Sequence, residues 1–130
     1  MKNQFYSLIC LLSAVLIFGF LAELALAQDA TIVDSAHYNV EFENEHVRVL
    51  RITYGPGEKS VMHEHPDGVV VILTDQSVNF TFPDGKTEQI TAKAGETIWA
   101  PGAKHLPENV GDKPFEVILV EMKVKSQTTE

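Results

Sequence analysis

Three histidines have the residue type and spacing of metal ligands. His63 and His65 form a His-Glu-His sequence, and His105 follows forty residues later. In an extended strand, residues i and i+2 point to the same face, so His63 and His65 can chelate one ion while Glu64 points away. A His-x-His pair also occurs on exposed strands, so a solvated pair at a sheet edge is the alternative.

Two further histidines, His37 and His46, lack a partner at ligand spacing. His46 lies in the polar sequence Glu-Asn-Glu-His and is expected to be solvated, and His37 precedes Tyr38 near the start of the strand-rich region. We expect neither to bind a metal. The sequence contains no Ser-His-Asp or Cys-His nucleophile arrangement, so any chemistry would depend on the metal.

The elements that must position these histidines are short strands. From residue 28 onward, β-rich runs alternate with Gly, Pro and Asp turn signals, and no long helical period occurs. Nine runs within about 85 residues predict an all-β sandwich or barrel. The predicted strands are 40–42, 47–54, 61–65, 69–73, 78–82, 88–91, 96–100, 105–109 and 115–123.

The order of these residues resembles the cupin superfamily. Its first motif has the form G-x5-H-x-H, which Gly57, His63 and His65 match, and its second motif is matched by Gly95, Pro101, His105 and Asn109, with one residue fewer between the proline and the histidine. The resemblance covers about residues 38–123. It implies a single jelly-roll β-barrel with a divalent transition metal (Fe, Zn, Ni, Mn or Cu) on His63, His65 and His105.

One departure concerns the fourth ligand of many cupins. The glutamate of the first motif falls at Val69 or Val70, so the resemblance implies a three-histidine variant. Asp67 and Glu108 are alternative carboxylates, but we expect Asp67 on a turn and Glu108 on the opposite strand face from His105. Three neutral imidazoles leave the charge of the ion uncompensated and coordination positions open.

Alternation along the strands suggests which side chains line the barrel. Phe80, Phe82 and Trp99 are candidates for the cavity wall, although filling the core is the favoured role for each. Arg48 shares a strand face with Leu50 and two further apolar residues. If that face points inward, Arg48 is placed to bind a substrate carboxylate, and if it points outward it is a surface residue.

The first 27 residues have the pattern of an export signal. Lys2 precedes the apolar run 8–20, and Ala25-Leu26-Ala27 provides the small residues of a cleavage site before Gln28. The alternative is an uncleaved membrane anchor, for which residues 5–22 are just long enough. We expect a cleaved signal peptide and a periplasmic or secreted protein.

Composition limits the remaining possibilities. The formal net charge of −8 argues against nucleic-acid binding, and a single cysteine, Cys10, excludes an intrachain disulfide. The expected organisation is a signal peptide (1–27), an N-terminal extension (28–37), a cupin domain (38–125) and a flexible tail (126–130). Small cupins that this chain resembles are commonly homodimers joined through sheet edges, which implies the same state here.

Three functions follow from these features. The first is a metal-dependent enzyme on a small molecule, since a three-histidine centre resembles the iron sites of cupin dioxygenases acting on thiols and diketones. The second is a metal-containing protein that binds a sugar or an anion without turnover. The third is a metal-free structural barrel.

Overall fold

The computed structural model describes residues 28–123, and the predicted signal peptide and flexible tail lie outside this range, as does Cys10. Within the described residues the chain forms a four-residue helix and nine strands. Their bounds are α2 Ala30–Val33, β1 Tyr38–Glu43, β2 Val47–Tyr54, β3 His63–His65, β4 Gly68–Ile72, β5 Gln76–Thr81, β6 Thr87–Ala92, β7 Thr97–Ala100, β8 Ala103–Asn109 and β9 Phe115–Met122.

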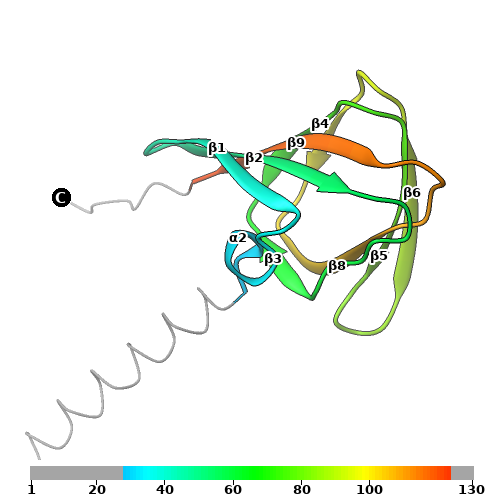
Figure 1. Cartoon of the computed structure of the whole chain (residues 1–130). Helices are drawn as coiled ribbons and strands as arrows, with labels where there is room; N and C mark the ends of the chain where they lie inside the picture. Colours follow the sequence, from blue (N-terminus) through cyan, green and yellow to red (C-terminus); the bar gives the residue numbers. More distant parts are fainter. Residues whose placement is uncertain (1–27, 124–130) are drawn as a thin grey trace, which may run out of the picture.

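Two antiparallel sheets face each other and form a small barrel (Figure 1). One sheet has five strands in the order β1-β2-β9-β4-β7, and the other has four in the order β3-β8-β5-β6. Strands that are distant in sequence lie side by side, as β2 and β9 do along their whole lengths. This confirms the all-β jelly-roll prediction, and each of the nine predicted strands overlaps an observed one.

Alternation along the strands determines which side chains fill the barrel. On β9, Phe115, Val117 and Leu119 are buried, while Glu116 and Ile118, which alternate with them, are partly exposed. The matching inward residues of β2 include Leu50 and Tyr54, each about fully buried. The apolar core therefore lies between the two sheets, and α2 packs against β1 and β3 at its side. No helix among residues 28–123 is long and apolar enough to cross a membrane.

The residues before β1 are attached to the barrel. Asp29 caps α2 by accepting a hydrogen bond from the Thr31 backbone at 2.9 Å, and the Glu64 amide on β3 donates to the Gln28 carbonyl at 2.9 Å. The side chain of Ala30 is fully buried. A short helix of this kind has too few residues to show a period in the sequence, which is why it was not predicted.

Three residues of the two motifs have structural roles. Gly57 and Gly95 adopt φ values of 75° and 89°, a left-handed conformation in which a side chain is strained. Asn109 is buried, and its amide donates to the carbonyls of Gly55 and Lys113 at 3.0 and 2.9 Å. These residues hold the turns around the histidine-bearing strands.

Candidate metal centre

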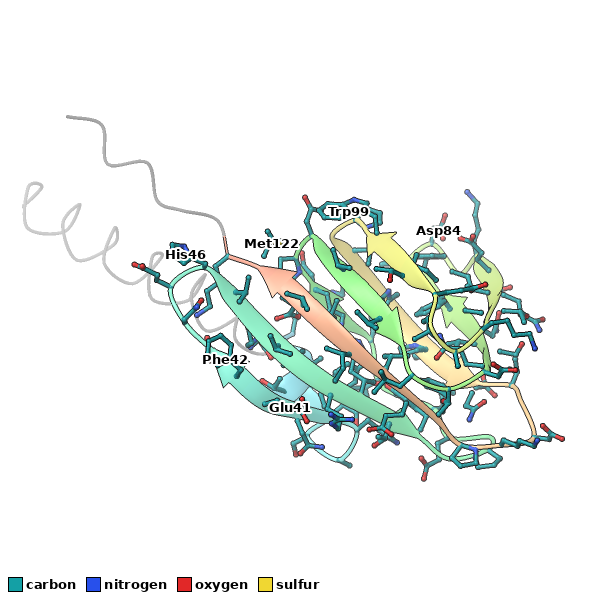
Figure 2. All side chains as sticks on the ribbon, turned by 90° about the horizontal axis from the view of Figure 1, so that it is seen from above. Glu41, Phe42, His46, Asp84, Trp99 and Met122 are labelled. Carbon is teal, nitrogen blue, oxygen red and sulfur yellow. The ribbon has the colours of Figure 1, made fainter. Side chains whose placement is uncertain are left out.

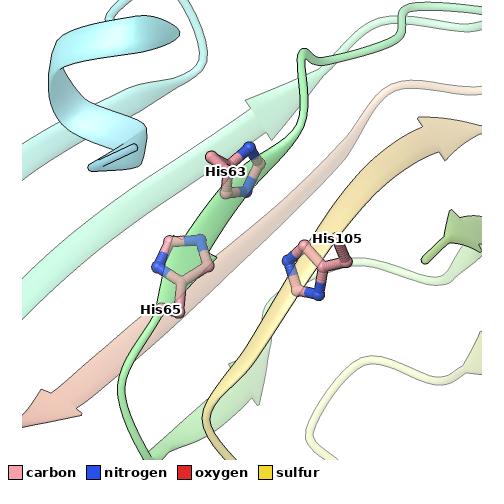
Figure 3. Close-up of side chains that lie close together, drawn as sticks. All are labelled: His63, His65 and His105. Atoms are coloured by element: carbon pink, nitrogen blue, oxygen red, sulfur yellow. The ribbon is translucent and has the colours of Figure 1, made fainter. Parts of the chain in front are cut away.

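Pairing of β3 with β8 brings the three histidines together. His63 lies directly opposite His105 in the register, and His65 is on the same face of β3 as His63. The rings converge on one point (Figure 3), and one nitrogen from each lies within 4.8 Å of the others. The sequence-predicted triad is therefore confirmed as a geometric cluster.

His63 is fully buried, and each of its ring nitrogens has a neighbour. Its Nδ1 lies 2.8 Å from the Val61 carbonyl, to which it donates, and 3.2 Å from the Ser60 hydroxyl. Its Nε2 lies 3.0 Å from the Tyr38 hydroxyl, which in turn accepts a hydrogen bond from Tyr54 at 3.0 Å. Because Val61 occupies Nδ1, the lone pair that remains for a metal is on Nε2.

His65 is held from behind by a buried carboxylate. Glu121 on β9 is 2 % exposed, and its Oε1 lies 2.5 Å from His65 Nδ1. Its other oxygen accepts a hydrogen bond from Arg48 Nε at 2.5 Å, and Arg48 also pairs with Asp29 at 2.7 Å. Although burial opposes ionisation, the hydrogen bonds from His65 and Arg48 hold the pKa of Glu121 below its usual value. The carboxylate therefore orients His65 and leaves its Nε2 free.

The environment keeps two of the imidazoles neutral. Burial, followed by the proximity of His65, lowers the pKa of His63 to about 4. Burial, followed by the charges of His65 and His63, lowers the pKa of His105 to about 3. Neutral imidazole is the form that binds a metal, so both rings have the correct protonation state at neutral pH without an ion.

These donors fit a divalent transition metal. In metal sites, the histidine nitrogen that does not bind the ion usually donates to a carbonyl or carboxylate, as Nδ1 of His63 and of His65 do here. Two metal–nitrogen bonds of about 2.1 Å allow at most about 4.2 Å between two ligand nitrogens. The three nitrogens lie within 4.8 Å of one another, so the rings need to move slightly closer to bind an ion. Glu121 lies on the far side of the His65 ring and is not a fourth ligand.

A cavity of about 120 Å³ adjoins the triad inside the barrel. His65 and His105 form part of its wall, and apolar residues of both sheets form most of the rest, with Phe80 packed on the His105 ring at a centroid distance of 4.9 Å. Gln76 also lines this cavity. Its Oε1 is buried and is the only such side-chain atom among residues 28–123 without a hydrogen-bond partner.

The structure shows which of the other predicted residues line the cavity. Of the three aromatic residues, Phe80 lines the cavity, whereas Trp99 is 57 % exposed on the outer face of β7 and Phe82 lies beyond the end of β5. The predictions that Trp99 and Phe82 line the cavity are therefore wrong. Arg48 points inward, but Glu121 and Asp29 neutralise it, so it is not free to bind a substrate carboxylate.

The alternative carboxylates and the remaining histidines lie outside the triad, as expected. Asp67 accepts a hydrogen bond from the Gly102 amide, and Glu108 lies 3.5 Å from the Lys59 ammonium. His46 is exposed, whereas His37 stacks on Tyr54 with ring centroids 4.1 Å apart and contacts Asp34.

Sequence reasoning missed two members of the site, Tyr38 and Glu121. Neither belongs to the quoted motifs, and each reaches the histidines from the opposite sheet. The one available signal was Glu121 itself, an acid on the otherwise apolar inward face of its strand. A buried acid needs a partner, and that requirement points to a site.

Comparison with known proteins identifies the fold. No family model matches the chain, and no curated protein matches it. Among solved structures, it is similar to a cupin domain from Bordetella pertussis Tohama I, with 28% identity and a TM-score of 0.62, over 67% of this chain and 92% of that one. An RmlC-like cupin family protein with a double-stranded β-helix fold from Methanocaldococcus jannaschii is 22% identical, with a TM-score of 0.52, over 68% and 83% of the two chains. The polyketide cyclase RemF from Streptomyces resistomycificus is 18% identical, with a TM-score of 0.50, over 65% and 63%.

Proposed function

We propose, from the cupin fold of this chain and its histidine triad, that it binds a divalent transition metal through His63, His65 and His105. The observation that carries this proposal is the preset Nε2 of His63 and His65, whose Nδ1 atoms are already held by Val61 and Glu121. An ion held there would supply an electrophilic centre with open positions and, with iron or copper, redox chemistry. Fe, Zn, Ni, Mn and Cu remain the candidates.

Metal analysis of protein purified without chelators tests this proposal. We expect close to one ion per chain in the wild type, and less than about a tenth of that in a His63/His65/His105→Ala variant. His46→Ala, which removes an exposed imidazole, is the matched control and should keep its metal. A wild type that takes up no Co²⁺, Zn²⁺ or Fe²⁺ in titration would overturn the proposal.

The cavity indicates what the metal would meet. At about 120 Å³ it is smaller than the roughly 300–1,000 Å³ of pockets for drug-sized ligands, so the ligand is small. Imidazole ligands add no negative charge to balance the ion, which favours an anionic ligand atom. Gln76 offers the opposite end of such a ligand an unused acceptor.

We therefore infer a small ligand with an anionic head, an apolar body and a hydrogen-bond donor at its far end. The absorption of Co²⁺-loaded protein measures the affinity for each of two thiols. The first is 3-mercaptopropan-1-ol, and the second is butane-1-thiol, which lacks the hydroxyl. We expect the hydroxyl compound to bind about tenfold more tightly, since a buried unpaired amide costs about 1–3 kcal/mol. Gln76→Leu should abolish the preference, whereas Gln89→Leu, on the exposed strand β6, should keep it.

Turnover of that ligand is the leading function, of the dioxygenase type on thiols, diketones or phenols. The alternative is a metal-containing protein that binds a sugar or an anion without reaction. One observation favours this alternative, because the described residues of the cavity wall include no carboxylate, lysine, serine or cysteine. Oxygen consumption by iron-loaded protein with each substrate class distinguishes the two functions, since binding without oxygen uptake supports the alternative.

Export by the N-terminal segment remains a proposal as well. It rests on the Ala-Leu-Ala sequence before Gln28 and the preceding apolar run. Sequencing the N-terminus of the protein recovered from its native cells should return Gln28 as the first residue. A protein that begins at Met1 and sediments with membranes would instead indicate the anchor.

A further inference from the structure

Two tyrosine hydroxyls connect the histidine triad with a partly buried aspartate. The Tyr38 hydroxyl lies 3.0 Å from His63 Nε2, and the Tyr54 hydroxyl lies 3.0 Å from that of Tyr38. The Tyr54 hydroxyl also lies 3.4 Å from Oδ2 of Asp34, which follows α2. Both tyrosines are buried, with Tyr38 4 % and Tyr54 1 % exposed. A continuous series of contacts therefore runs from the metal-binding nitrogen of His63 to a carboxylate.

The series continues from Asp34 to solvent through His37. The His37 ring lies between two carboxylates, with Nδ1 2.7 Å from Asp34 Oδ1 and Nε2 3.2 Å from Glu58 Oε2. Glu58 is exposed and lines an open surface groove of about 320 Å³ together with His37 and with Glu116, which contacts Arg51. An imidazole can take up a proton at one nitrogen and release one from the other. His37 is therefore placed to exchange the proton of Asp34 with solvent.

The hydrogen of the Tyr54 hydroxyl has two acceptors within reach, Tyr38 and Asp34. In the metal-free protein, Tyr38 donates to His63 Nε2 and Tyr54 donates to Tyr38. With Nε2 bound to an ion, Tyr38 loses this acceptor and is free to donate to Tyr54, whose hydrogen then turns to Asp34. Burial raises the pKa of both hydroxyls, so each stays neutral and gives up a proton only as it accepts another.

The inner cavity has no base of its own for a ligand proton. Apart from His65 and His105, which bind the ion, its described wall residues include no carboxylate or lysine. Thiols and phenols are neutral at neutral pH and must lose a proton to bind through an anionic head. Tyr54 lines both the cavity and the outer groove, so its hydroxyl lies on a route between them.

We propose that Tyr38, Tyr54 and Asp34 form a proton relay that deprotonates a ligand entering the cavity as a neutral acid. The relay rests on the proposed function, because the head of the ligand binds the ion of the triad. For a thiol, the S–H bond breaks and the sulfur keeps the electron pair. Its proton goes to the Tyr38 oxygen, the Tyr38 proton goes to Tyr54, and the Tyr54 proton goes to Asp34 Oδ2. His37 then takes up a proton at Nδ1 and releases one from Nε2 towards Glu58 and solvent.

The pH dependence of thiol binding tests this relay. The absorption of Co²⁺-loaded protein after rapid mixing with 3-mercaptopropan-1-ol gives the association rate constant from pH 6 to 7.5. With the relay, the binding species is the neutral thiol, whose concentration is nearly constant in this range, so the wild-type rate constant should not rise with pH. Without it, only thiolate formed in solution binds, and its concentration rises about tenfold per pH unit. A wild-type rate constant that follows the thiolate concentration would overturn the proposal.

Two variants interrupt the relay at different points. Tyr54→Phe removes the middle hydroxyl, and Asp34→Asn removes the carboxylate that accepts the proton. In each, the rate constant should rise about tenfold per pH unit and should be at least about tenfold below that of the wild type at pH 6. Asp84→Asn removes a carboxylate from the exposed turn between β5 and β6 (Figure 2), and it should behave like the wild type.

The other outcomes distinguish the relay from the proposed function. Tyr54→Phe and Asp34→Asn variants that keep the wild-type profile would overturn the relay, since the proton then leaves by another route. A chain that takes up no Co²⁺ lacks the metal site, and a Co²⁺-loaded chain that binds no thiol lacks the inferred ligand class. Either result removes the relay together with its premise. Far-ultraviolet circular dichroism checks that the variants are folded, and if they are not, the wild-type profile decides alone.

Discussion

Glu121 connects the core of the barrel with the metal centre. Its carboxylate lies between Arg48 and His65, and Arg48 is anchored in turn by Asp29 at the start of α2. A buried carboxylate without such partners would be protonated or strongly destabilising. The series of contacts from Asp29 through Arg48 and Glu121 to His65 therefore fixes the ring orientation of one ligand, and none of the first three residues binds the ion.

Replacement of Glu121 by glutamine should weaken metal binding. The amide still fills the space but removes the charge that holds His65 Nδ1, and loss of such a partner typically reduces metal affinity by about 10–100-fold. Isothermal titration with Zn²⁺ measures the effect. Glu116→Gln, which removes an arginine-paired carboxylate from the outer face of the same strand, should leave the affinity unchanged.

Tyr38 competes with the ion for His63. Its hydroxyl donates to the Nε2 lone pair that a metal needs, so this hydrogen bond exists only in the metal-free protein. Tyr38→Phe should therefore lower the metal-free unfolding free energy by about 1 kcal/mol and raise Zn²⁺ affinity up to about fivefold. Urea unfolding with and without Zn²⁺ measures both quantities. A loss of affinity would instead mean that the hydroxyl contributes to the metal-bound state.

Strand β4 shows why the usual carboxylate is missing from the centre. Its register against β9 places Val70 opposite Leu119, on the inner face, and Val69 opposite Val120, on the outer face. Val70 lines the cavity beside His65 and His105. Of the two valines at the motif position, Val70 is therefore the one that stands in place of the fourth ligand.

Val70→Glu should restore a fourth ligand and tighten Mn²⁺ or Co²⁺ binding by about tenfold or more. The buried carboxylate should also lower the melting temperature of the metal-free protein, because it has no partner without the ion. Titration followed by Co²⁺ absorption and thermal unfolding test both effects. Leu73→Glu adds the same charge at an exposed position and should change neither. Unchanged affinity in Val70→Glu would contradict the inward placement of residue 70.

For the whole molecule, the neutral histidines couple folding to pH. The folded pKa values of about 4 for His63 and about 3 for His105 lie below the ordinary value of 6.5. Between pH 6.5 and 4 the unfolded chain therefore binds more protons than the folded one, and the metal-free unfolding free energy falls as the pH is lowered.

Urea unfolding of the metal-free protein at pH 7.5, 6, 5 and 4 measures this dependence. Carboxylates also titrate at the low end of this range, so the wild type is compared with a His63→Asn/His105→Asn variant. This variant should lose less unfolding free energy than the wild type between pH 7.5 and 5. His46→Asn should follow the wild type, because its ring is exposed in the folded protein. Equal slopes in all three proteins would contradict the assigned protonation states.

The sequence could predict the strands and the ligand triad because both depend on local patterns. Alternation of apolar residues and the turn residues between runs predicted nine strands, and the His-x-His spacing placed two rings on one face. The third ligand and the barrel came from the cupin resemblance of Gly57, Gly95 and His105. The structure explains why the motifs contain glycine at positions 57 and 95, since both residues adopt left-handed conformations that other residues rarely reach.

Long-range pairing decided the rest. The sequence by itself determined which residues alternate along each strand and which types could bind a metal, because both are properties of the local chain. Only the tertiary structure decided that β2 and β9 bring Arg48 and Glu121 behind His65, that Tyr38 reaches His63, and that Trp99 faces outward. These contacts join residues up to 73 positions apart, and strand order and register, which no local pattern encodes, place them.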